Sequence, residues 1–221
     1  MYPWVSHTHS HLGGECPHRC SYCYVDAFRM RSAKYQGPLR LIEKELEVIY
    51  GKGKTIFIEN CNDLFAESIP LSMSERIIAH CIKYPGNTYV FQTKNPARYR
   101  EIRAFPENTI FGCTIESNRH YPHISHAPQP SERFEVMELL RYLDYRTFVT
   151  IEPILGFDVD VLASWIIRIR PEFVNIGADS KGRKLPEPPY EKVLALIDIL
   201  KRYGIEVREK RNLDRLKARQ S

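Results

Sequence analysis

The sequence lacks any long uninterrupted hydrophobic run. Its longer apolar stretches, such as residues 161–169, are broken by polar residues, here Ser164 and Arg168. A membrane-spanning helix needs about 20 apolar residues in succession. The first residues, MYPWVSHTHSHLGG, also lack the basic segment followed by an apolar segment that marks a secretory signal. We therefore predict a cytoplasmic protein without membrane contact, whose thiols are kept reduced.

Compositional bias is also absent. The 221 residues are 43% hydrophobic and 27% charged, with 11 glycines and 15 prolines, which excludes fibrous, disordered and low-complexity classes. This length predicts one domain with a full hydrophobic core. We assign residues 1–208 to that domain and residues 209–221 to a basic C-terminal tail.

No excess charge of either sign is spread over the body of the chain. The formal net charge is +5, and residues 201–221 alone hold eight Lys or Arg against three Asp or Glu. The rest of the protein is therefore close to neutral. Two interpretations of the basic end stay open: a contact to phosphate groups through sequence-independent electrostatics, or an ordinary solvated helix face.

The six cysteines are distributed unevenly, and their spacing carries the main functional signal. Three lie within eight residues, at Cys16, Cys20 and Cys23, and the other three are scattered singly. A disulfide framework is disfavoured, because such frameworks belong to small secreted domains and the cluster would leave an odd cysteine.

Two kinds of metal site remain. Structural zinc takes four ligands, usually as two separated pairs, and no second pair is obvious, although nearby histidines could supply a fourth ligand. Three thiolates on one short loop can instead hold three irons of a cubane iron–sulfur cluster and leave the fourth iron open for chemistry. The spacing favours the cluster, and zinc stays open as the alternative.

The segment CPHRCSYC also places an aromatic residue, Tyr22, directly before the last cysteine. With this pattern the chain resembles the radical S-adenosylmethionine (SAM) superfamily. The resemblance implies that Cys16, Cys20 and Cys23 bind a [4Fe–4S] cluster, that SAM chelates the remaining iron, and that Tyr22 lies against the adenine. It also implies an external one-electron reductant of the flavodoxin or ferredoxin type.

Strand-like and helix-like segments alternate along the chain, as in a parallel sheet with crossover helices. The predicted strands are residues 4–9, 55–59, 88–92, 109–115, 148–151 and 173–177, with 205–207 as a short extra strand. The predicted helices are residues 39–50, 72–84, 96–103, 131–143, 158–168 and 190–203, with Ser72 and Ser131 as N-caps. Six such units predict an α/β fold, a partial (β/α)6 TIM-like barrel of the radical SAM type with its helices outside.

Polar residues concentrate where the predicted strands end, which is where parallel βα folds place their functional groups. The resemblance makes the following residues candidates for SAM binding: Glu59, Asn60, Thr93, Lys94, Glu116, Asn118, Glu152 and Ile154. Within this set we expect Glu116 at the ribose, Lys94 at the SAM carboxylate or a substrate phosphate, and Ile154 against the adenine.

One segment departs from the family pattern. The second predicted strand is followed by Glu59-Asn60-Cys61-Asn62-Asp63, where radical SAM proteins commonly carry Gly-Gly-Glu. Backbone carbonyls here could still bind the SAM amino group. That the asparagines are turn residues and Asp63 a helix cap is an equally open interpretation. Cys61 is a candidate hydrogen donor to a product radical, with a buried structural thiol as the alternative.

Three further segments, TKNPARY, GCTIESN and TIEPILG, narrow the resemblance. They are similar to segments of a branch that contains spore photoproduct lyase-like proteins and phage-type radical SAM proteins of unassigned function, and the similarity runs from Trp4 to about Arg208. This implies reductive cleavage of SAM to a 5′-deoxyadenosyl radical that takes hydrogen from a substrate, with lyase or transferase chemistry left open.

The substrate is named only by class. Reversal of a thymine lesion in DNA is known in this branch, which makes a nucleic acid or nucleotide, undergoing repair or modification, the leading substrate class. The alternative from another class is a nucleic-acid-binding module with structural zinc at the cysteine loop. The His-rich and Pro-rich segment over residues 119–130 is predicted as a loop at the mouth of the site.

Overall fold

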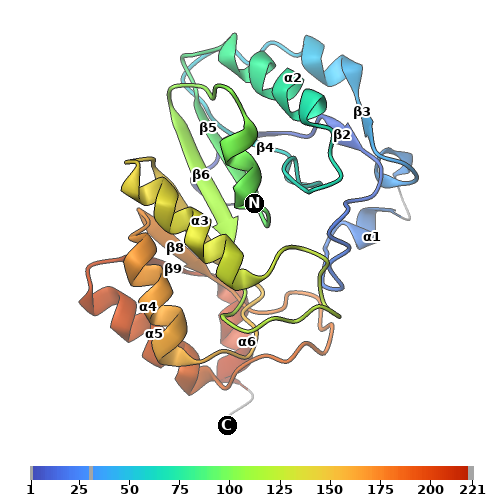
Figure 1. Ribbon diagram of the computed structural model, residues 1–221. Coiled ribbons are helices and arrows are strands. Elements are labelled where there is room, and N and C mark those ends of the chain that lie inside the picture. Colours follow the sequence, from blue (N-terminus) through green and yellow to red (C-terminus); the bar gives the residue numbers. More distant parts are fainter. Residues whose placement is uncertain (1, 30–31, 219–221) are drawn as a thin grey trace.

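Seven parallel strands form one sheet in the computed structural model, which describes residues 2–29 and 32–218 (Figure 1). The strand order is β1 (His7–His9), β4 (Thr55–Ile58), β5 (Thr88–Thr93), β6 (Thr109–Thr114), β7 (Thr147–Ile151), β8 (Phe173–Ile176) and β9 (Glu206–Glu209). The two edge strands do not pair, so the barrel is partial, as the sequence predicted. The short extra strand was also predicted, and it adds a seventh parallel strand as β9.

Helices cover the outer side of the sheet (Figure 1). They are α2 (Leu71–Ile82), α3 (Pro130–Tyr142), α4 (Val159–Ile169) and α5 (Tyr190–Arg202), and the 3-10 helix η3 (Pro96–Glu101) takes the place of a helix after β5. The predicted N-caps Ser72 and Ser131 are wrong, because the helices start earlier. Pro70 precedes α2, and Pro130 opens α3 at a position where a missing N–H is tolerated.

The predicted helix over residues 39–50 is wrong. The chain instead forms β3 (Arg40–Leu41), which pairs antiparallel with β2 (Leu12–Gly13), and then the 3-10 helix η2 (Glu43–Glu47). The apolar residues at helical spacing do not form one buried helix face. Leu41 pairs with Leu12 in this ribbon, and Ile49 is 77% exposed. Two short helices, α1 (Asp26–Arg29) and η1 (Ala33–Tyr35), complete the first crossover.

Two hydrophobic clusters hold the layers together. The larger one fills the space between sheet and helices, and every residue of β6 and β7 is buried. These strands therefore read as nearly continuous apolar runs, as expected for a sheet covered on both faces.

The smaller cluster lies inside the partial barrel, where Tyr2, Trp4 and Val5 pack against inward-facing side chains that include Phe148. At Gly112 of β6 a Cβ atom would approach the Phe148 ring to 2.2 Å, so any larger residue at this position would have to displace that ring.

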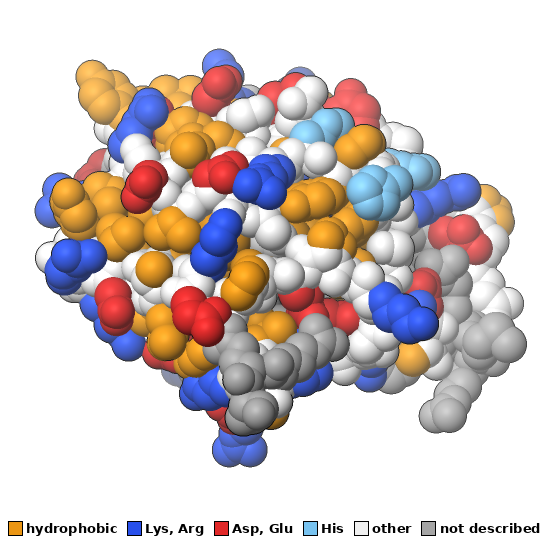
Figure 2. Space-filling view, turned by 90° about the horizontal axis from the view of Figure 1, so that it is seen from below, with side chains coloured by type: hydrophobic (Ala, Val, Ile, Leu, Met, Phe, Trp, Pro, Cys, Tyr) orange, Lys and Arg blue, Asp and Glu red, His pale blue; other side chains and the backbone are white. Residues whose placement is uncertain are grey.

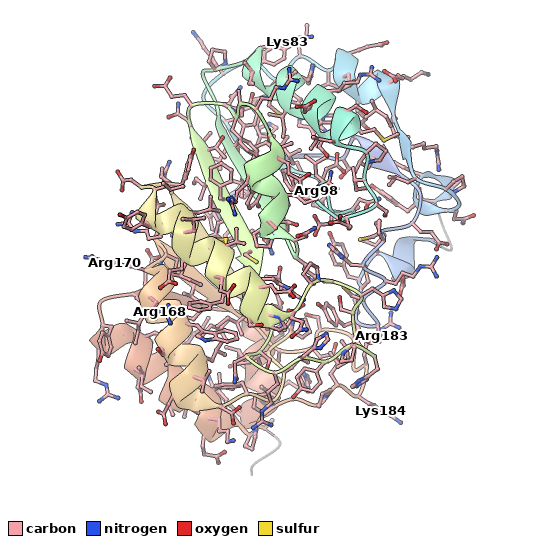
Figure 3. The ribbon with its side chains drawn as sticks, in the orientation of Figure 1. Lys83, Arg98, Arg168, Arg170, Arg183 and Lys184 are labelled. Atoms are coloured by element: carbon pink, nitrogen blue, oxygen red, sulfur yellow. The ribbon has the colours of Figure 1, made fainter. Side chains whose placement is uncertain are left out.

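The outer helices are also joined by charged side chains. Arg168 of α4 lies toward α3 (Figure 3), where its Nε atom is 2.7 Å from Glu138 Oε1 and its guanidinium covers the Phe134 ring at 4.8 Å. Such exposed pairs contribute little stability each. In the described part of the chain, none of the helices is both long and apolar enough to cross a bilayer.

The end of the chain is packed against the barrel. After β9 come η4 (Arg211–Leu213) and α6 (Asp214–Lys217), whose Leu213 and Leu216 are buried in the main core. Arg208 lies 3.5 Å from the centre of the Phe173 ring, and Arg215 pairs with Glu187. Several basic residues of the C-terminal segment thus have partners within the protein. Seen from below, the surface of the protein carries charges of both signs interspersed with apolar side chains (Figure 2).

Candidate active site

A cavity of about 390 Å³ opens at the carboxyl ends of the strands. The loop that follows β2, which we call the cluster loop (residues 14–25), forms one wall. Strand ends form the opposite wall, through Thr93, Lys94, Thr114, Thr150 and Glu152. Tyr2 and Phe57 also line the cavity, so the chain's first residues help to build it.

The thiols of Cys16, Cys20 and Cys23 all line this cavity, and all three are free and partly buried. Burial raises the pKa of Cys16 to about 12 and also raises the pKa of Cys23. A thiol with a raised pKa is neutral at pH 7 unless a metal ion compensates the thiolate. Three thiols that face one cavity on a single loop are a donor set that fits an iron–sulfur cluster.

Among residues 2–29 and 32–218, no three His, Cys, Asp or Glu side chains lie together as ligands of one metal ion. Zinc needs its ligands at about 2.0 to 2.3 Å from a single point. A cubane cluster instead takes one thiolate on each of several irons. The absence of such a group among the described residues therefore bears on a single-ion site such as zinc and not on an iron–sulfur cluster.

A buried contact between His18 and Asp63 anchors the cluster loop. His18, between the first two cysteines, places its Nε2 atom 2.9 Å from Asp63 Oδ2. The same carboxylate accepts hydrogen bonds from the Thr93 hydroxyl at 2.7 Å and the Lys94 backbone N–H at 2.8 Å. Burial acts to raise the pKa of Asp63, but His18 and these donors outweigh it and lower the pKa to about 2. Asp63 thereby ties the cluster loop to the end of β5.

A second charged network lies behind Tyr22. The Tyr22 hydroxyl donates to Glu116, whose other carboxylate oxygen is 2.7 Å from Arg133 Nη1. Lys94 Nζ lies 3.5 Å from Glu116 and 5.4 Å from the centre of the Tyr22 ring. Burial acts to raise the pKa of Glu116, but Arg133 and Lys94 outweigh it, and the pKa falls to about 2.

Glu116 thus holds the ring and the ammonium that face the cavity without lining the cavity itself. Its predicted contact to the ribose stays a prediction.

The segment after β4 is held by local contacts. The Glu59 carboxylate accepts hydrogen bonds from the His11 backbone N–H and, at 3.3 Å, from the Leu12 backbone N–H. The carboxylate therefore faces the β2 ribbon, although Glu59 also borders the cavity. The Asn60 carbonyl accepts from the Tyr24 hydroxyl, which lies 4.0 Å from Cys61 Sγ.

Besides Glu116, two other predicted SAM-binding residues, Asn118 and Ile154, do not line this cavity. Asn118 exchanges hydrogen bonds with Asp158, the residue before α4, at 3.1 and 2.8 Å. Ile154 is fully buried in the main core, and its N–H donates to the Gly177 carbonyl at 2.8 Å. In this structure both residues have partners outside the cavity, and their predicted contact to SAM stays a prediction.

Glu152 does line the cavity, and its partners come from the C-terminal segment. Its carboxylate accepts from Lys210 Nζ and from Asn212 Nδ2, the latter at 2.9 Å. Lys210 and Lys181 also line the cavity. Lys210 falls in the region that the sequence sets apart as a basic tail, and no local pattern signals its approach to the site.

The loop after β8 meets the start of the chain across the open side of the barrel. Arg183 lies 3.7 Å from Asp26 of α1 (Figure 3). The Asp179 carboxylate accepts backbone N–H groups of this same loop, from Lys181 at 2.9 Å and from Arg183. Asp179 thus stabilises the turn of this loop.

Comparison with solved structures identifies the fold. A variant of spore photoproduct lyase with bound AdoMet (SAM) and dinucleoside spore photoproduct matches with a TM-score of 0.65 at 12% identity, covering 95% of this chain and 77% of that chain. Streptococcus suis SuiB bound to S-adenosylmethionine matches with a TM-score of 0.66 at 8% identity, covering 94% and 51%.

SuiB bound to precursor peptide SuiA gives a TM-score of 0.69 at 7% identity, covering 98% and 52%. The chain thus has the fold of radical SAM enzymes, and spore photoproduct lyase is among its relatives in structure. A scan against protein-family models and a search of curated proteins each give no match.

Proposed function

We propose that this protein is a radical SAM enzyme. The observation that carries the proposal is that Cys16, Cys20, Cys23 and Tyr22 line one cavity at the carboxyl ends of parallel strands. A [4Fe–4S] cluster with SAM would supply an adenosyl radical that takes hydrogen from the substrate. The three cysteines would hold this cluster, and a flavodoxin or ferredoxin would supply the electron.

The residues around the cysteines would orient SAM and exclude water. Lys94 is buried, and although burial acts to lower its pKa, Glu116 and other neighbouring groups raise it. It therefore remains an ammonium that can pair with the SAM carboxylate. Tyr22 would offer its ring to the adenine. Thr93 and the carbonyls of Glu59 and Asn60 border the same space and would bind the SAM amino group.

A nucleotide or nucleic acid is the proposed substrate class. Two observations support it: lysines 181 and 210 line the cavity, and a structural relative is seen with dinucleoside spore photoproduct. Phosphate groups are natural partners of such lysines. Whether the outcome is lyase or transferase chemistry is a separate question for product analysis.

Cys61 is the proposed hydrogen donor to the product radical. Its thiol lines the cavity and is partly buried. All six cysteines are free, which suits a reducing compartment such as the cytoplasm.

The test is anaerobic purification, cluster reconstitution and incubation with SAM and dithionite. We expect about four irons per chain and formation of 5′-deoxyadenosine, both lost when Cys16, Cys20 and Cys23 are changed together to alanine. The matched control is Cys61→Ala, which should keep the iron and the 5′-deoxyadenosine. Stoichiometric zinc without iron would instead favour the zinc-module alternative, and iron without 5′-deoxyadenosine would end the proposal.

A further inference from the structure

The loop over residues 119–130 packs directly on the cluster loop. The Ser125 hydroxyl lies 3.2 Å from Cys20 Sγ, within hydrogen-bond range for sulfur. We propose that Ser125 donates a hydrogen bond to the Cys20 thiolate and thereby raises the reduction potential of the cluster. This inference rests on the proposed function, since it concerns a cysteine assigned to that cluster.

The direction of this hydrogen bond follows from the other partner of the hydroxyl. Ser125 Oγ accepts the backbone N–H of Ala127 at 3.2 Å. A serine hydroxyl has a single proton to donate, and a metal-bound thiolate has none. The proton on Ser125 is therefore directed to the sulfur.

Backbone hydrogen bonds on both sides keep Ser125 in place. The Ser21 N–H donates to the Ile124 carbonyl at 2.8 Å, and the His126 N–H donates to the His18 carbonyl at 2.8 Å. Ser125 itself is only 9% exposed. The hydroxyl is thus held next to the sulfur before any cluster binds. Cluster binding then needs little further ordering of the Ser125 side chain.

The loop is anchored in turn to the sheet. The Tyr121 hydroxyl donates to the Gly156 carbonyl at 2.8 Å, and Gly156 follows β7. Ser117 donates to the same carbonyl at 2.6 Å. The loop is therefore a fixed support for the cluster loop rather than a free segment at the mouth.

The physical consequence concerns the electron that the cluster takes up. Reduction adds negative charge, which spreads to the sulfur ligands. A hydrogen bond to one of these sulfurs stabilises the reduced state more than the oxidised state, and so raises the potential. Removal of the hydroxyl should therefore make the cluster harder to reduce.

The experiment is a redox titration of the reconstituted protein, followed by electron paramagnetic resonance at matched iron content. Ser125→Ala should lower the equilibrium constant for reduction of the cluster about tenfold. This corresponds to a reduction potential lower by about 59 mV for one electron. Ser125→Thr and Ser125→Val form a matched pair of the same shape, and only the valine variant should titrate at a lower potential. Ser21→Ala, an exposed neighbour of Cys20, should titrate as the unchanged protein.

Equal potentials for the threonine and valine variants would overturn the inference, as would an equal shift in Ser21→Ala. Failure of the unchanged protein to assemble a cluster would overturn the proposed function as well. The two failures are therefore distinguishable by the iron content of the unchanged protein.

Discussion

Asp63 joins three parts of the structure, and its replacement tests whether this junction holds the cluster loop. The carboxylate is buried and accepts from His18, Thr93 and the Lys94 N–H. Asp63→Asn removes the charge and turns one acceptor oxygen into a donor that faces these donors. We expect the variant to fold less stably and to retain less iron, because His18 lies between Cys16 and Cys20.

The magnitude follows from the pKa of Asp63. The pKa is about 2, against 3.8 for an ordinary aspartate. At about 1.4 kcal/mol per pKa unit, this difference is on the order of 2 kcal/mol of stability. Because the folded-state pKa is the lower one, the contribution is complete above pH 3.8 and is lost as the pH falls toward 2. Leaving buried donors without an acceptor typically costs about 1 to 3 kcal/mol, and more where a charged group is involved, so we expect a loss of about 2 to 4 kcal/mol at pH 7.

The assay is urea unfolding followed by circular dichroism, at matched metal content and at several pH values. Asp63→Asn should lower the free energy of unfolding at pH 7, and its difference from the unchanged protein should narrow below pH 4. The control is Asp198→Asn on the exposed face of α5, which should change stability by less than about 0.5 kcal/mol. Equal stability of Asp63→Asn and the unchanged protein at pH 7 would refute the argument.

Two further substitutions test the packing behind the site. Arg133→Met should lower the free energy of unfolding by about 3 to 5 kcal/mol in urea titrations, because Lys94, at 3.5 Å, is the one charged partner that Glu116 would keep among the described residues. A loss below about 1 kcal/mol would contradict this. Gly112→Ala should lower stability by about 1 to 3 kcal/mol, because its Cβ would meet the Phe148 ring at 2.2 Å. A melting temperature unchanged from that of the original protein would show that the ring moves aside freely.

Much of the fold could be predicted because its signals are local. The buried strands are short apolar runs such as β7, and the crossover helices α4 and α5 show apolar residues at helical spacing. The first crossover could not be predicted in this way. There the pairing of Leu12 with Leu41, which lie far apart in the sequence, overrides a helical pattern.

The candidate site was also predicted only in part from the sequence. Thr93, Lys94 and Glu152 line the cavity because strand ends in a parallel sheet converge at one edge. Asn118 and Ile154 also follow strands, yet their turns direct them to Asp158 and to the core. Sequence position identifies the edge of the sheet but not the direction of each side chain.

The sequence by itself determined the alternation that builds a parallel sheet and the cysteine spacing that points to a cluster, because both are patterns of neighbouring residues. Only the tertiary structure decided what surrounds that cluster loop. Asp63 reaches His18, Ser125 reaches Cys20, and Lys210 enters the cavity from the C-terminal segment. In the sequence, Asp63 lies 45 residues from His18, and Ser125 lies 105 residues from Cys20. Contacts between residues so far apart form only when the strands between them are packed.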